Sequence, residues 1–271
     1  MTPTTAEQDD RRRVKLTLHY DGAGFFGWQT QPDTRTVQGE LEAALERLTQ
    51  TRGSVIAAGR TDRGVHATGQ VVGVAVPRRW EPAELRRALN AVLPPDVWVA
   101  RAEAVPWSFH ARYDAIGRAY VYRVGVDGVA RSPFLRRWCW PLGRALAPAA
   151  LEAAASRFPG EHSFRAFAKS GQPERGEMCT VHRAGWRPWR SLGWELHVTA
   201  NRFLHHMVRY MVGTMVDVGL GRRPVEDIDR LLANEPGAET SVPAPPEGLY
   251  LSRVIYERDE LESETADEVL S

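Results

Sequence analysis

Apolar side chains recur at every second position in residues 14–20 (VKLTLHY), a spacing typical of a strand with one buried face. Residues 36–49 carry them at helical spacing instead, with two glutamates near the positive N-terminal end. The same reasoning, continued to residue 105, predicts the order β-α-β-β-α-β. The expected elements are a strand at 14–20, a helix at 36–49, strands at 54–58 and 70–76, a helix at 82–92 and a strand at 97–105.

The second half of the chain repeats this order without repeating its sequence. The expected elements are strands at 118–126, 181–187, 194–200 and 250–256, helices at 148–157 and 203–218, and a small extra helix at 225–233. Each half then has the split β-α-β topology, which RNA-recognition domains also use to present a sheet to bases. The sequence predicts an α+β fold of two ferredoxin-like halves whose antiparallel sheets meet around a central cleft.

The two ends of the chain differ from the rest in composition. Residues 1–13 and 257–271 are charged, short of large apolar side chains and without a period, so we expect disordered tails, the second of them acidic. Between them we expect an N-terminal half at 14–108 and a C-terminal half at 109–256.

Charge and cysteine content narrow the class of protein. Residues 14–256 carry a net charge of +7, and 33 of the chain's 35 basic residues are arginine. This positive charge permits a nucleic-acid partner, although arginine in place of lysine also follows from a GC-rich genome.

Cys139 and Cys179 are lone thiols, expected as buried small side chains rather than a disulfide or zinc site. With no signal peptide and no membrane span in the sequence, the expected location is the cytoplasm.

The densest group of reactive side chains lies at 59–70 (GRTDRGVHATGQ), between two expected strands. Three glycines allow close approach by a ligand. Asp62 stands between Arg60 and Arg63, and flanking arginines favour an ionised carboxylate that can act as a nucleophile. A solvated loop with an ion pair between the aspartate and an arginine remains the alternative.

The expected helix at 203–218 adds a second group. Arg209 falls at the edge of its apolar stripe, where a desolvated guanidinium needs an anionic partner. Asp62 is one candidate for this partner and Asp217 another. His205 and His206 are adjacent rather than four residues apart, so no metal site is expected from them.

Several ordered motifs resemble the tRNA pseudouridine synthase A family, and the resemblance covers residues 14–256. They are YDG at 20–22, FGWQ at 26–29, VQGELE at 37–42, GRTDRGVHATGQV at 59–71, FHARYDAIGRAYVYRV at 109–124, NRFLHHMVRYMVG at 201–213 and GLYL at 248–251. One departure is visible, because Arg63 stands where the family pattern has alanine.

The resemblance implies a role for four residues. Asp62 matches the catalytic aspartate, and Arg60 would help to hold the flipped nucleotide or its phosphate. Tyr120 matches the tyrosine that stacks on the target base, and Arg209 matches the arginine that pairs with the aspartate. It further implies a homodimer that acts on uridines 38, 39 and 40 in the anticodon arm of tRNA.

Such an enzyme breaks the bond between C1′ and N1, rotates the uracil and rejoins it through C5, so no cofactor or metal is expected. The sequence leaves open whether Asp62 attacks C1′, adds to C6 or assists loss of the 2′ proton. Two other classes also stay open: a non-catalytic RNA-binding protein of the same fold, and a metal-dependent hydrolase using Asp62 with nearby histidines.

Overall fold

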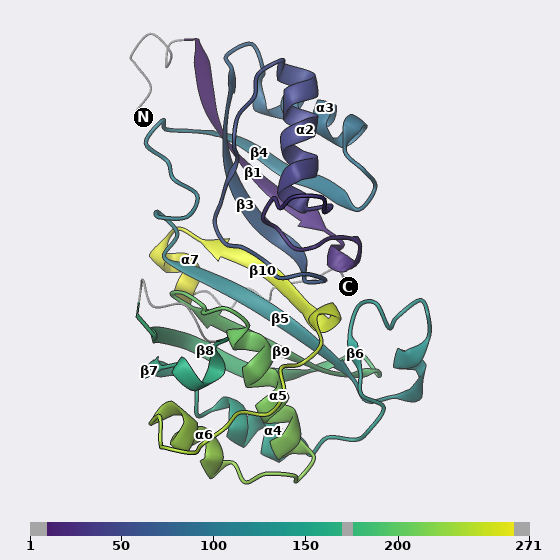
Figure 1. Ribbon diagram of the computed structural model, residues 1–271, viewed down its shortest axis with the longest axis vertical. Helices are drawn as coiled ribbons and strands as arrows, with labels where there is room; N and C mark the ends of the chain where they lie inside the picture. The colour runs from purple at the N-terminus through teal and green to yellow at the C-terminus, as the bar shows by residue number, and fades with distance from the viewer. Residues whose placement is uncertain (1–9, 170–175, 263–271) are drawn as a thin grey trace. The chain divides into compact units, whose positions relative to one another are not determined.

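The predicted order of elements is observed in both halves of the chain. The structure, a computed structural model, describes residues 10–169 and 176–262 (Figure 1). By their contacts these residues form two compact units. The first runs to Ala115 and includes Leu251–Tyr256, and the second comprises the described residues of 116–250 and of 257–262. The α+β class with antiparallel strand pairing is thereby confirmed.

The first unit is a sheet covered by two helices. Its elements are β1 (Arg11–Tyr20), α2 (Val37–Thr49), β2 (Ile56–Ala57), β3 (His66–Pro77), α3 (Pro82–Val92) and β4 (Val97–Val105). Strand β1 lies between β3 and β4 and is antiparallel to both. Val14, Leu16 and Leu18 are fully buried on one face of β1, as the alternating pattern predicts. Figure 1 shows α2 and α3 side by side over this sheet.

The second unit has the same plan with short additions. Its elements are β5 (Gly117–Gly125), β6 (Trp140–Pro141), α4 (Pro148–Ala155), β7 (Gly160–Ser163), β8 (Met178–Trp189), β9 (Gly193–Ala200), α5 (Met207–Gly219) and α6 (Glu226–Leu232). Strand β9 lies between β5 and β8 and is antiparallel to both. The last strand, β10 (Leu249–Ile255), begins in this unit, and its residues from Leu251 onward belong to the first.

Both expected tails are shorter than the composition suggested. Strand β1 begins at Arg11, where the Arg11 guanidinium donates to the Ala75 carbonyl and Arg12 forms a two-pronged ion pair with Glu81. These contacts allow charged residues to extend the strand toward the N-terminus, beyond residue 14, where the alternating apolar pattern predicts that it begins. At the other end, α7 (Arg258–Glu262) occupies the start of the expected acidic tail. Residues 1–9 and 263–271 of these tails lie outside the described residues.

Helix α5 begins at Met207, four residues later than predicted. His206, the residue before it, has a φ of 65°. A left-handed residue cannot continue a right-handed helix, so Leu204 and His205 lie in the connection before it. The prediction that the helix includes His205 was therefore wrong, whereas Arg209 does lie on α5 and is half-buried.

The prediction for the two cysteines is confirmed. Cys139 and Cys179 are free thiols, and both are buried. Burial raises the pKa of each thiol to about 11. Among the described residues, no helix has the length and apolar character needed to cross a membrane.

Candidate active site

Asp62 lies in the first unit, in the segment that joins β2 to β3. Strand β3 begins at His66, so the polar stretch predicted as a loop up to residue 70 is strand in its second half. The ladder continues past β2, because the Ala58 N–H donates to the Val71 carbonyl over 2.8 Å. A turn then forms as the Val65 N–H donates to the Asp62 carbonyl over 3.2 Å. Asp62 is consequently presented from a short loop that is closed at both ends.

The residue before Asp62 is held by two hydrogen bonds from the motif YDG…FGWQ. The hydroxyls of Thr61 and Tyr20 lie 2.8 Å apart, and both side chains are buried. The Trp28 N–H donates to the Thr61 carbonyl over 3.0 Å. Burial raises the pKa of the Tyr20 phenol, which keeps it protonated and able to hydrogen bond at neutral pH.

Two glycines allow this motif to pack directly against the loop. A Cβ at Gly22 would lie 2.0 Å from the Val65 carbonyl oxygen. Gly27 has a φ of +93°, and a Cβ there would lie 2.7 Å from the Thr61 carbonyl oxygen. Only glycine allows backbone to approach backbone this closely. The Asp62 loop is therefore braced along its length by residues 22–28.

The two arginines that flank Asp62 point into solvent. Arg60 and Arg63 are exposed, whereas Asp62 is half-buried. Among the described residues, neither arginine forms an ion pair with Asp62, which rules out the simple loop ion pair that the sequence left open. The Arg63 guanidinium instead lies over the ring of Phe26, 4.3 Å from its centroid.

Tyr120 and Arg209 lie in the second unit. Tyr120 is half-buried on β5, and its ring meets that of Phe203 edge-to-face at 4.9 Å. On α5, the Arg209 Nε donates to the Ala244 carbonyl over 2.7 Å. The Tyr122 hydroxyl donates to the next carbonyl, that of Pro245, also over 2.7 Å. Side chains from a strand and a helix thus fix the same short segment, and Arg209 is held by it in return.

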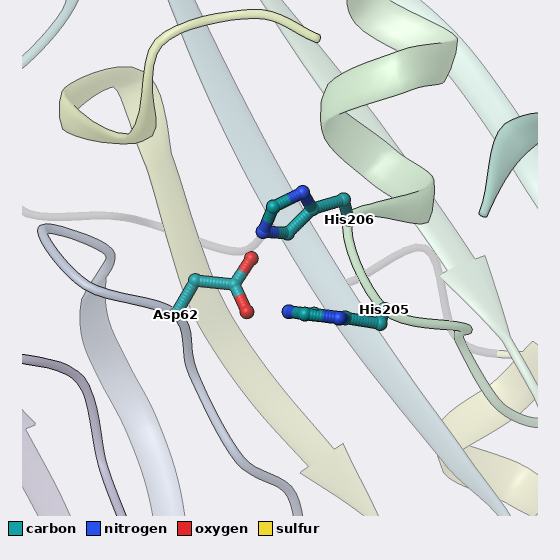
Figure 2. A group of neighbouring side chains, drawn as sticks. All are labelled: Asp62, His205 and His206. Atoms are coloured by element: carbon teal, nitrogen blue, oxygen red, sulfur yellow. The ribbon is translucent and has the colours of Figure 1, made fainter. Parts of the chain in front are cut away.

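His205 and His206 lie in the connection that enters α5, with ring centroids 4.1 Å apart. Figure 2 shows the two imidazoles there, together with Asp62 from the loop before β3. Within either unit alone, the described residues bring no three His, Cys, Asp or Glu ligands together. Asp62 and Arg60 belong to the first unit, and Tyr120 and Arg209 to the second.

Sequence reasoning missed the residues that hold the loop. Tyr20, Gly22, Gly27 and Trp28 stand in motifs noticed only as parts of a resemblance. The available signal was the run of glycines around a phenylalanine pair that directly follows the first predicted strand. Because the contact with residue 61 spans about forty residues of chain, no local pattern reveals it.

Comparison with known proteins decides the family. The family model for tRNA pseudouridine synthase matches residues 17–114 and 154–257. The chain belongs to the tRNA pseudouridine synthase family. Of the four predicted site residues, Arg60, Asp62 and Arg209 lie within the matched ranges, and Tyr120 lies between them.

Two related proteins are similar to this chain in sequence over nearly its whole length. The tRNA pseudouridine synthase A of Methylacidiphilum infernorum is 42% identical over 91% of this chain and 96% of its own. That of Pseudothermotoga lettingae is 40% identical over 90% of this chain and 100% of its own. A chain of the archaeal box H/ACA sRNP Nop10-Cbf5 complex aligns with 13% identity and a TM-score of 0.35, covering 90% of this chain and 50% of that one. The protein is thus an isomerase that acts on uridine in tRNA.

Proposed function

We propose that this synthase isomerises uridines 38, 39 and 40 in the anticodon arm of tRNA, with Asp62 as its nucleophile. The observation that carries the assignment is the construction of the Asp62 loop. Its backbone is braced by Tyr20, Trp28 and two tightly packed glycines, while the half-buried carboxylate is not paired with either flanking arginine. A nucleophile has to be held in position, and the braced backbone of this loop meets that need.

The reaction conserves all the atoms of the base. The bond between C1′ and N1 breaks, the uracil turns, and C5 bonds to C1′ while the C5 proton leaves to solvent and N1 gains a proton. Asp62 would form a transient bond to C1′ or to C6, or would assist departure of the 2′ proton. Since no group is imported and no electron is transferred, the proposal includes no cofactor and no metal.

The substrate must leave its stack before any of these steps. Flipping a base costs a few kcal/mol. Tyr120 would return about 1–3 kcal/mol by stacking on the uracil, its own ring being held edge-on by Phe203. Arg60, exposed two residues before the nucleophile, would hold the flipped nucleotide or its phosphate. Arg209 would pair with Asp62, its orientation being fixed by the bond to Ala244.

The assembly and location of the enzyme are proposals on the same footing. The resemblance of its motifs to tRNA pseudouridine synthase A supports a homodimer in the cytoplasm. Free, buried thiols suit a reducing compartment.

Tritium release from tRNA labelled at uridine C5 tests the proposal, because isomerisation at any uridine expels that hydrogen. The enzyme should release tritium from unmodified tRNA and lose that release when uridines 38, 39 and 40 are all replaced by cytidine. Undiminished release from the replaced tRNA would contradict the choice of the anticodon arm. Chelation with EDTA, using tRNA folded beforehand, should leave the rate unchanged, and a loss restored specifically by zinc would favour metal-dependent chemistry.

A further inference from the structure

The position where this chain departs from its family pattern carries an exposed cation at the rim of the Asp62 loop. We propose that Arg63, held flat over the ring of Phe26, binds a backbone phosphate of the tRNA beside the uridine that is isomerised. The choice of that phosphate rests on the proposed role of Asp62, the residue next to Arg63. The proposal that Arg63 binds a phosphate at all rests instead on how its guanidinium stacks on the Phe26 ring.

The first argument is that the Arg63 guanidinium has no ion-pair partner and that its stack on Phe26 contributes little to stability. Arg63 is exposed and forms no ion pair within the described chain, and the Phe26 ring is 43% exposed. A phenylalanine this exposed gives up a large part of the stabilisation that full burial would provide. A cation over an exposed ring adds only about 0.5–1 kcal/mol. The stack of Arg63 on the ring therefore adds little to the stability of the fold.

The second argument is that the backbone holds both members in place. The Phe26 N–H donates to the Arg35 carbonyl over 2.9 Å, and the Gln31 side chain donates to the Phe26 carbonyl over 3.2 Å. Gly27, directly after Phe26, packs against Thr61 and the Arg63 nitrogen so closely that a Cβ would lie 3.2 Å from the latter. The ring and the guanidinium are consequently presented by two braced segments rather than by mobile loops.

The third argument is the chemistry of a stacked guanidinium. Stacking occupies the face of the group and leaves the N–H donors along its edge, a fork that matches two phosphate oxygens. Holding the group flat before the substrate arrives reduces the conformational entropy lost on binding. A positive charge beside Asp62 also offsets the repulsion between that carboxylate and the phosphates that must pass near it.

Equilibrium binding to tRNA over a range of salt concentrations tests the contact. Arg63→Ala should weaken binding about five- to tenfold and should lower the slope of log affinity against log salt by about 0.7–0.9, the value for one lost phosphate contact. Phe26→Leu keeps the cation and loses the stack, so it should raise KM with little change in kcat. Arg79→Ala is the matched control, since Arg79 is exposed and unpaired within the described chain and follows β3 at its far end, roughly 35 Å away.

One further measurement locates the phosphate, and the salt slope keeps the inference separate from the role of Asp62. In an anticodon-arm RNA with one methylphosphonate, placed in turn at each linkage around the target, one linkage should weaken binding to wild type but leave binding to Arg63→Ala unchanged. Binding does not require turnover, so the salt slope reports on Arg63 even if Asp62 or the anticodon arm is wrongly assigned. An unchanged slope for Arg63→Ala would overturn the inference. So would a fall in melting temperature large enough to account for the lost affinity, which would make Arg63 a brace for Phe26.

Discussion

The phenol oxygen of Tyr20 and the hydroxyl oxygen of Thr61 lie 2.8 Å apart, one residue before the proposed nucleophile. Tyr20 ends the first strand of the chain, and Thr61 lies about forty residues later. Their hydrogen bond ties the loop that presents Asp62 to the central strand of the first unit. The position of the carboxylate thus depends on a buried contact that takes no part in the chemistry.

Tyr20→Phe removes this hydrogen bond and leaves the ring in place. The free energy of unfolding should fall by about 1 kcal/mol, since the buried Thr61 hydroxyl loses its partner, and kcat should fall because the Asp62 loop is less well held. Urea unfolding and tritium release measure the two effects. Tyr250→Phe is the matched control in the second unit, where the Tyr250 hydroxyl donates to the Trp138 carbonyl over 2.7 Å. It should cost similar stability with little change in kcat, and equal kcat losses in both variants would contradict this view of Tyr20.

Gly27→Ala should be strongly destabilising. Its backbone has a φ of +93°, and the added Cβ would lie 2.7 Å from the Thr61 carbonyl oxygen, so we expect a loss of about 2 kcal/mol or more in urea unfolding. Gly59→Ala is the control from the same region, because a Cβ there meets nothing within 4 Å. It should leave stability nearly unchanged. A Gly27→Ala variant as stable as wild type would mean that residues 22–28 do not pack on the loop as described.

The stability of the second unit should depend on acid through Glu195. Burial alone would raise the pKa of Glu195, but hydrogen bonds from His197 and Arg123 outweigh it and hold the pKa below its ordinary value. A carboxyl group with a lowered pKa in the folded state stabilises the protein above its unfolded-state pKa, and this stabilisation is lost as the pH falls.

Glu195→Gln should therefore lower the melting temperature near neutral pH and flatten its fall as the pH drops below the ordinary glutamate pKa of 4.5. Thermal unfolding across this range makes the measurement. The control is Glu161→Gln, an exposed acid on β7 with no ion pair in the described chain. If both variants keep the wild-type slope, Glu195 does not contribute to the acid sensitivity.

The elements of the fold were predictable because their signal is local. Alternation at 14–20 and helical spacing at 36–49 each reflect one buried face, and the structure has β1 and α2 there. Boundaries were harder, since long-range pairing sets them. Arg11 and Arg12 join β1 through partners on β3 and before α3, and no neighbouring residue reveals those partners. The start of α5 depended on the left-handed conformation of one residue, His206, which the spacing of apolar residues does not reveal.

The reactive residues of the candidate site could be predicted from the sequence, but the residues that hold them in position could not. Asp62 stood out because an acid between two arginines and three glycines is unusual in a connection between strands. The brace from Tyr20 and Gly27 was invisible because it joins segments far apart in sequence. The stack of Arg63 on Phe26 was missed for the same reason, although the unusual residue at position 63 had marked the place.

The most direct test of the central assignment is Asp62→Asn, measured both for tRNA binding and for tritium release. Asparagine keeps the shape of the side chain and can still accept a hydrogen bond, but it is a poor nucleophile and has no charge. The variant should bind tRNA within about tenfold of wild type, or about 1.4 kcal/mol, with an unchanged salt slope. Tritium release should drop to background, because the path of the reaction has been removed rather than one contact. Substantial residual release would contradict the assignment, and so would a loss of affinity large enough to explain the whole loss of activity.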